Sequence, residues 1–222
     1  MGADLFHELS TSELRREVNR LAGADPRSLP DRAKVFSAIA KLQKFDELPE
    51  VVEGAEFESR LLQGDVEVQR GLASCNGVPA RVYFRDLLRG AMHPGTQIAY
   101  GHGIYLATPS RPCELTGFPI ISQVALRYAR GTAGEAGMIA RGALQSGART
   151  LELDDLRPLF RENRNRAAAA GITDVGSFAA ALGFDAFYVD GAFEDTDERV
   201  WIVVNRSALV FQAQGLQIAP QA

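Results

Sequence analysis

The stretch GHGIYLA, residues 101–107, decides the fold of this chain because it joins a glycine-spaced turn to a short apolar strand. Gly101 and Gly103 carry no Cβ atoms, so the backbone around His102 can turn tightly and a flat ligand can lie against it. Tyr105 would present an aromatic face to such a ligand. The sequence therefore predicts a binding site at the start of this strand.

A second informative stretch, QRGL at residues 69–72, lies about thirty residues earlier in the chain. Val66, Val68 and Arg70 alternate with acidic and polar neighbours, which predicts a half-buried strand. Arg70 offers a planar cationic fork that suits phosphate or ribose oxygens. An arginine on a strand is more often a surface cation, but the nearby GHGIYLA stretch favours a binding role here.

Length and composition indicate a globular protein. The chain has 222 residues, of which 46% are hydrophobic and 23% charged, so one domain with a helical extension is expected. The net charge of −4 argues against nucleic-acid binding by charge alone, although a local basic patch remains compatible with it. Cys75 and Cys113 have no metal-ligand spacing, and the three histidines are scattered, so we expect free thiols and no metal site.

Targeting signals are not recognised in the sequence. No charged segment followed by an apolar run opens the chain, and no run of about eighteen apolar residues occurs. We therefore expect a protein without a membrane partner that is cytoplasmic where it is made, or exported by a route that needs no cleaved signal.

The pattern of apolar residues predicts an α+β fold with helices first. Helices are expected over 5–21, with a break near Ser10, which forms a capping box with Glu13, and then over 35–42 and 53–62. Residues 1–65 are interpreted as a helical extension, and residues 66–222 as the remaining domain. In that domain we expect strands at 66–70, 104–107, 138–144, 150–153, 184–189 and 200–204, and helices at 82–88, 120–130, 154–170 and 177–182.

Four motifs together resemble the ADP-ribosyltransferase family over residues 66–211. They are the RG pair after a strand, the GxGIY[FL]A strand, a following helix that ends in an aromatic residue, and the segment from GFDA to WIVVNRSALV. The resemblance implies two packed, mostly antiparallel sheets around a cleft for NAD, which is the substrate. It further implies a mono-ADP-ribosyltransferase of bacterial or phage type, since the first motif holds arginine rather than histidine.

The resemblance also implies roles for individual residues. Arg70 would hold the NAD ribose or phosphate, and the backbone of Gly71 would hold the nicotinamide amide. Tyr105 would pack on the nicotinamide ring, and Tyr128 would close its other side. His102, whose place is equally that of a turn residue, would have at most a minor binding role. The expected NAD-binding set is Arg70, Gly71, His102, Gly103, Tyr105 and Tyr128.

The catalytic carboxylate is where the sequence departs from the family pattern. Val200 occupies the position of the family's glutamate. Glu198 lies two residues earlier and would share a strand face with Val200, so it is the first candidate, with Asp197 second. The expected catalytic set is therefore Arg70, Tyr105 and Glu198, and the loop 194–199 is a candidate for acceptor recognition.

Several alternatives stay open at this point. The acceptor would be a protein, RNA or DNA. A toxin or effector role, with delivery into a target cell or packaging in a virion, would add an immunity protein as partner. The rival functions are an NAD glycohydrolase and a non-catalytic NAD-binding or virion structural module. Arg161, Arg164 and Arg166 are interpreted as a solvated helix face, with recognition of an acidic or nucleic-acid target as the alternative.

Overall fold

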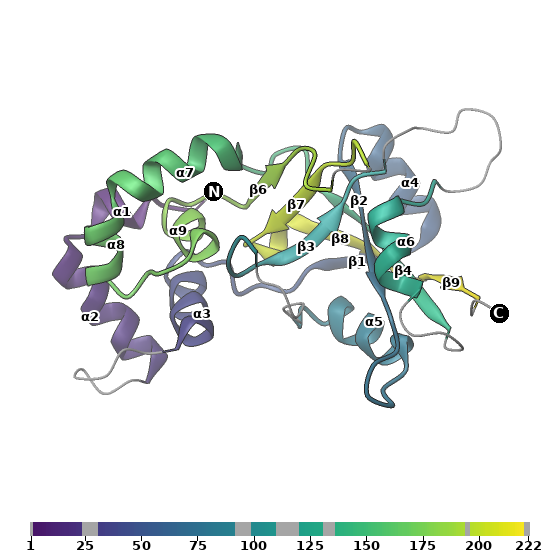
Figure 1. The fold of residues 1–222 in the computed structure, drawn as a ribbon, viewed down its shortest axis with the longest axis horizontal. Helices are drawn as coiled ribbons and strands as arrows, with labels where there is room; N and C mark the ends of the chain where they lie inside the picture. The colour runs from purple at the N-terminus through teal and green to yellow at the C-terminus, as the bar shows by residue number, and fades with distance from the viewer. Residues whose placement is uncertain are drawn as a thin grey trace.

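The computed structural model describes residues 2–23, 31–91, 99–109, 120–130, 136–193 and 196–219, and these form an α+β fold (Figure 1). The predicted fold class is confirmed at this level. The helices are α1 (Leu5–Glu8), α2 (Thr11–Ala22), α3 (Arg32–Leu42), α4 (Gly54–Leu62), α5 (Ala80–Leu88), α6 (Gln123–Arg130), α7 (Leu153–Glu162), α8 (Arg164–Ala169) and α9 (Val175–Ala181). The strands are β1 (Glu50–Val52), β2 (Val66–Leu72), β3 (Ile104–Ala107), β4 (Gly137–Leu144), β5 (Thr150–Glu152), β6 (Ala186–Val189), β7 (Val200–Val203), β8 (Leu209–Gln212) and β9 (Leu216–Ile218).

The strands form one sheet in the order β1-β8-β4-β2-β3-β7-β6-β5, with β9 paired to β4. The pairs β1/β8 and β5/β6 are parallel, and the others are antiparallel. β2 pairs with β4 along its whole length, but with β3 only where Gln69 lies opposite Ala107. Where two packed sheets were expected, the described strands form one continuous sheet, whose halves meet at this single pair.

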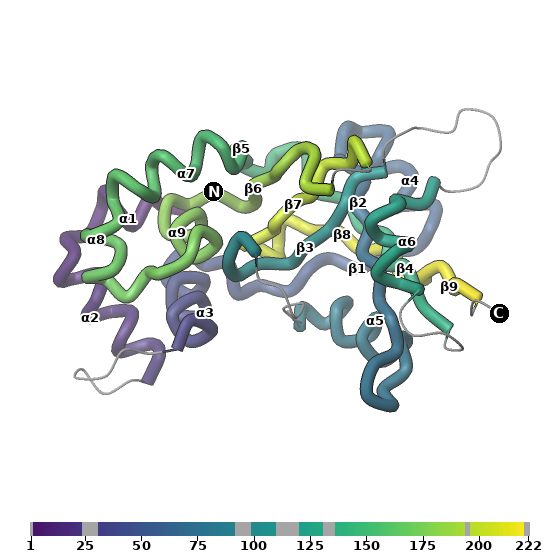
Figure 2. Tube along the Cα trace, viewed as in Figure 1, coloured from purple at the N-terminus to yellow at the C-terminus, as the bar shows by residue number. Residues whose placement is uncertain are grey.

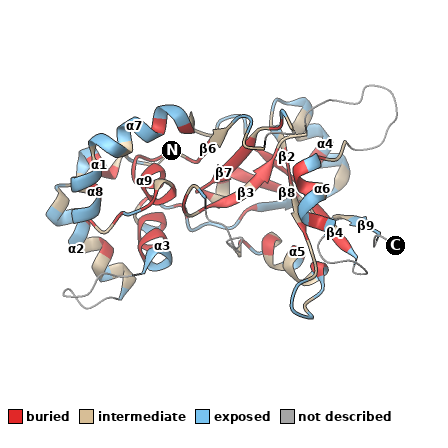
Figure 3. Cartoon of the chain, viewed as in Figure 1, coloured by how far each residue is buried: buried red, intermediate tan, exposed pale blue. Residues whose placement is uncertain are grey.

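The two faces of the sheet are covered by different helices. Val68 and Leu72 share a buried core with Leu106, Trp201 and Phe84 of α5, and we call this side the α5 face. The alternate residues of the same strands point to the opposite side, because side chains alternate along a strand. We call that side the α6 face, since α6 packs there against β2 and β4. Most strand residues between the two helical layers are buried (Figure 3).

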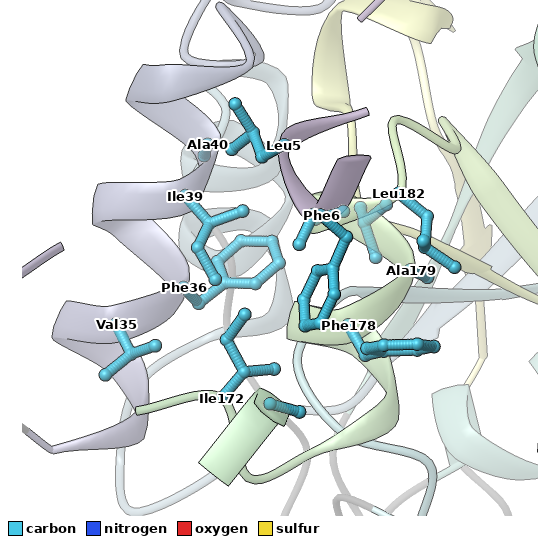
Figure 4. Packing of buried hydrophobic residues seen from close by; sticks show 14 of the residues in the cluster. Leu5, Phe6, Val35, Phe36, Ile39, Ala40, Ile172, Phe178, Ala179 and Leu182 are labelled. Atoms are coloured by element: carbon cyan, nitrogen blue, oxygen red, sulfur yellow. The ribbon is translucent and has the colours of Figure 1, made fainter. Parts of the chain in front are cut away.

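Helices from both ends of the sequence share one hydrophobic core beside the sheet. The purple helices α1–α3 lie against the green helices α7–α9 in the chain trace (Figure 2). Figure 4 shows Phe6, Phe36, Ile39 and Phe178 pointing into this interior, and the rings of Phe6 and Phe178 are 5.1 Å apart. The same core includes Ile202 of β7. We call these six helices the helical lobe; their core continues onto the sheet.

The division predicted at residue 65 does not separate helix from sheet, because β1 lies before it and pairs with β8. Within the helical lobe, the break near Ser10 is confirmed, and Ser10 and Glu13 form the predicted capping box. Arg166 of the predicted solvated face instead ties α8 to α1. Its guanidinium donates to the carbonyl oxygens of Phe6 and Leu9.

Some element boundaries differ from those predicted. The helix expected over 154–170 begins at Leu153, has Glu152 as its N-cap, and divides at Asn163 into α7 and α8. β4 and β5, which are consecutive in the chain, do not pair with each other, because β4 lies inside the sheet and β5 at its edge. β1, β8 and β9 were not predicted. Among the described helices, none is long and apolar enough to cross a bilayer.

Candidate functional site

The turn before β3 is shaped by contacts within the protein. Gly101 has a φ of +94°, and a Cβ atom on it would lie 2.3 Å from Oδ1 of Asp174. A Cβ atom on Gly103 would lie 2.5 Å from Cγ2 of Ile202. The space beside both glycines, expected to admit a flat ligand, is therefore occupied by Asp174 at the start of α9 and by β7.

His102 is held by Asp174, a residue that the sequence analysis did not single out. Its backbone N–H donates to Oδ1 of Asp174 at 2.9 Å, and its ring Nδ1 lies 3.6 Å from Oδ2. The His102 ring stacks on Phe36 of α3, with centroids 5.5 Å apart and planes at 20°. The side chain thus contacts the helical lobe.

Asp174 is buried and ionised. Burial alone would raise its pKa, but hydrogen bonds from His102 and Ser177 outweigh this and lower it to about 2. Oδ1 accepts from the backbone N–H of Ser177, and Oδ2 accepts from its hydroxyl at 2.7 Å. Asp174 therefore caps α9 and fixes the turn around His102 with one carboxylate. The local signal for it was an aspartate three residues before a serine at a helix start.

Tyr105 is fixed through its hydroxyl. The group donates to the carbonyl oxygen of Gly101 at 2.8 Å and accepts from the backbone N–H of Tyr100 at 3.1 Å. Desolvation raises the pKa of Tyr105 to about 12, so the phenol is neutral. The ring therefore has a set orientation, on the α6 face of β3 next to Ile202 of β7.

Arg70 and Gly71 lie just beyond the pair that joins β2 to β3. Strand alternation puts Arg70 on the α5 face with Val68, opposite to the face of Tyr105. Arg70 is partly buried, and desolvation lowers its pKa to about 10, which leaves it cationic at neutral pH. Gly71 lies under α6, since a Cβ atom on it would be 1.8 Å from the carbonyl oxygen of Ala125. Close helix packing thus accounts for this glycine.

Glu198 is buried at the N-terminal end of α6, with 1% of its surface exposed. Its Oε2 accepts from the hydroxyl of Ser122 at 2.6 Å and from the backbone N–H of Val124 at 3.0 Å, and its Oε1 accepts from that of Gln123 at 2.8 Å. The carboxylate therefore acts as the cap of α6. Gln69 of β2 extends this network by accepting from the backbone N–H of Ser122 at 2.9 Å.

Val200, at the position of the family's glutamate, and Asp197, the second candidate for the catalytic carboxylate, lie in different surroundings. Val200 is 6% exposed and packs opposite Ala107 in the core. Asp197 is exposed and lines a surface hollow of about 450 Å³ with Thr108, Arg199 and neighbouring residues. Of the two predicted carboxylates, Asp197 faces solvent, whereas both oxygens of Glu198 are engaged in bonds to α6.

Tyr128 lies on the outer surface of α6 with 55% of its surface exposed. Its ring meets Phe193 edge to face, with centroids 6.5 Å apart. The structure thus links Tyr128 to the loop after β6. Together with the Glu198 bonds, this contact connects α6 to two residues, Phe193 and Glu198, of the segment between β6 and β7.

The predicted site residues form three groups in the structure. Arg70 and Gly71 lie on β2, the turn residues 101–103 and Tyr105 lie at β3, and Tyr128 and Glu198 are joined through α6. In the described part of the chain, no three histidine, cysteine or carboxylate side chains gather as a metal site. Cys75 is exposed, whereas Cys113, His93 and residues 194–195 lie outside the described residues.

Comparisons of the chain with models of known protein families, with curated proteins and with solved structures give no match.

Proposed function

We propose that this protein binds NAD at the junction of β2 and β3 and transfers its ADP-ribose unit to a protein or nucleic-acid acceptor. One observation carries the proposal. The RG and GxGIY motifs, far apart in sequence, lie on adjacent strands that share only the pair Gln69–Ala107. Arg70 and Tyr105 are one and two residues from that pair. In this proposal the two halves of the single sheet, which meet at this pair, correspond to the two sheets that were expected around an NAD cleft.

The side chains at this junction suit the parts of a dinucleotide. Arg70, still cationic at a pKa of about 10, would pair with the pyrophosphate or a ribose oxygen. Tyr105 offers a ring that is already oriented by two hydrogen bonds, and Tyr128 offers an exposed ring on α6. Since Arg70 and Tyr105 leave their strands on opposite faces, the ligand would have to extend across the junction.

The reaction breaks the bond between the nicotinamide nitrogen and C1′ of the ribose. The electron pair of that bond leaves with nicotinamide, which departs as a neutral molecule while positive charge develops on the ribose. A lone pair of the acceptor then forms the new bond to C1′, and the proton of the acceptor passes to a carboxylate or to water. Asp197 is open to solvent for this role, whereas Glu198 must first release the N-terminus of α6.

A second candidate function is NAD binding without transfer. The buried Val200 at the family's glutamate position favours it, as do the three hydrogen bonds that hold Glu198. In this case the ligand would occupy the same junction, and no glycosidic bond would break.

Incubation with NAD labelled in its adenylate part, in the presence of whole-cell protein or RNA, separates these candidates. Transfer predicts label on the acceptor and free nicotinamide, and Arg70→Lys should reduce both, because lysine lacks the planar fork. Arg81→Ala, on the exposed surface of α5, is the matched control and should retain the wild-type rate. Free nicotinamide without any acceptor would indicate hydrolysis instead, and saturable binding without cleavage would support the second candidate.

A further inference from the structure

We propose that His102 is a positioning residue through which α3 and α9 of the helical lobe hold the turn at residues 101–103 and the ring of Tyr105 in place. The inference rests on the proposed NAD site. It gives the N-terminal helices a role in ligand binding, and it moves His102 from a ligand contact to a residue that acts through Tyr105.

The first link is between His102 and Asp174. Both side chains are nearly enclosed, at 13% and 6% exposure, and the carboxylate meets both the backbone N–H and the ring of His102. The remaining bonds of the carboxylate go to Ser177 within α9. Because one anion serves the turn and the helix together, displacement of either would leave buried donors without an acceptor.

The second link is steric and fixes the turn against both helices. A Cβ atom on Gly176 of α9 would lie 2.0 Å from the carbonyl oxygen of His102, so the two backbones are in close contact. On its other side the imidazole ring stacks on Phe36, which is itself buried in α3. His102 is therefore enclosed between α3 and α9, two helices that lie far apart in the sequence.

The third link joins the turn to the proposed ligand-binding ring. Tyr105 donates to the carbonyl oxygen of Gly101, the residue immediately before His102, and accepts from Tyr100. A shift of the turn would therefore remove the bonds that orient the phenol. The contacts run without a gap from Phe36 through His102 and Gly101 to Tyr105, which connects the helical lobe to β3.

Two variants test this connection, His102→Ala and Phe36→Leu. Phe6→Leu is the matched control, because Phe6 lies in the same core and contacts Phe178 rather than His102. Hydrogen exchange of the backbone amides at residues 101–105 reports how firmly the turn is held, with or without NAD. Calorimetric titration with NAD, at a temperature where all variants are folded, reports the dissociation constant.

We expect His102→Ala and Phe36→Leu to speed exchange at residues 101–105 and to weaken NAD binding about tenfold, since the contact of an oriented aromatic ring with a ligand contributes about this much. Phe6→Leu should lower the melting temperature and leave both readouts unchanged. Wild-type exchange rates in both test variants would overturn the inference, as would faster exchange with unchanged affinity. If the wild type does not bind NAD, the proposed function fails, and the exchange rates still decide whether the helical lobe holds the turn.

Discussion

The carboxylate of Glu198 accepts a 2.6 Å hydrogen bond from the hydroxyl of Ser122, and this bond joins the start of β7 to the start of α6. Two backbone N–H groups of α6 donate to the same carboxylate. An anion at this place satisfies donors that a helix leaves open and complements the helix dipole. Glu198 therefore has a structural task that competes with any role as a freely moving catalytic carboxylate.

Replacement of Glu198 tests this task. Glu198→Ala removes the acceptor for three donors, of which those of Ser122 and Val124 are buried. Each bond is worth about 1 kcal/mol, so we expect a loss of about 3 kcal/mol in the free energy of unfolding. Urea denaturation measures it. Glu162→Ala, at the exposed end of α7, is the control and should change stability by less than about 0.5 kcal/mol. Equal midpoints for the two variants would mean that Glu198 does not anchor α6.

Gly71 offers a test of how closely α6 packs on β2. Gly71→Ala would put a Cβ atom 1.8 Å from the carbonyl oxygen of Ala125, so α6 must move away from the sheet. We expect a loss of at least about 2 kcal/mol, the typical cost of overpacking. Gly147→Ala meets nothing within 4 Å and serves as the control. A Gly71→Ala protein as stable as wild type would contradict the close contact of α6 and β2.

The pH dependence of stability should report Asp174. Its pKa falls from 3.8 to about 2 on folding, because the bonds from His102 and Ser177 outweigh desolvation. A depressed carboxylate pKa stabilises the fold above pH 4, and the stabilisation is lost as the pH falls from about 4 to about 2. The shift corresponds to about 2 kcal/mol.

Asp174→Asn cannot ionise, so it should lack this component of the acid transition. Chemical denaturation of wild type and variant between pH 2 and pH 7 measures the difference, which should grow with pH up to about 4 and then stay constant. A difference that is the same at every pH would show that the carboxylate does not titrate with a lowered pKa.

Tyr128 can be tested without disturbing the fold, because it is exposed on α6. If its ring stacks on part of NAD, Tyr128→Ala should weaken NAD binding about tenfold, the effect of losing about 1.4 kcal/mol of aromatic contact. Tyr128→Phe keeps the ring and should bind as wild type does. Titration calorimetry gives both constants, and an unaltered affinity in Tyr128→Ala would exclude the ring from the site.

Much of the fold follows from local patterns in the sequence. Apolar spacing predicts α2, α3 and α6, and the Ser10–Glu13 capping box predicts where α2 begins. β1, β8 and β9 were missed because their pairing is set by partners distant in sequence: β1 pairs with β8, and both β8 and β9 pair with β4.

The candidate site was harder to predict for a different physical reason. In the sequence, a glycine that leaves room for a ligand looks the same as a glycine that leaves room for a closely packed helix. Gly71 and Gly101 therefore did not reveal that α6 and α9 approach them. The bonds from Glu198 to the start of α6 span more than seventy residues of sequence. Such partners follow from tertiary packing, which local pattern does not encode.

Backbone amide chemical shifts, recorded with increasing NAD, test the central claim most directly. Binding at the junction of β2 and β3 predicts saturable shift changes at Arg70, Gly71 and residues 103–105. In Arg70→Lys these changes should reach half-saturation at a higher NAD concentration, whereas in Arg81→Ala the half-saturation concentration should equal that of the wild type. An unchanged spectrum, or shifts confined to the hollow around Asp197, would contradict an NAD site at this junction.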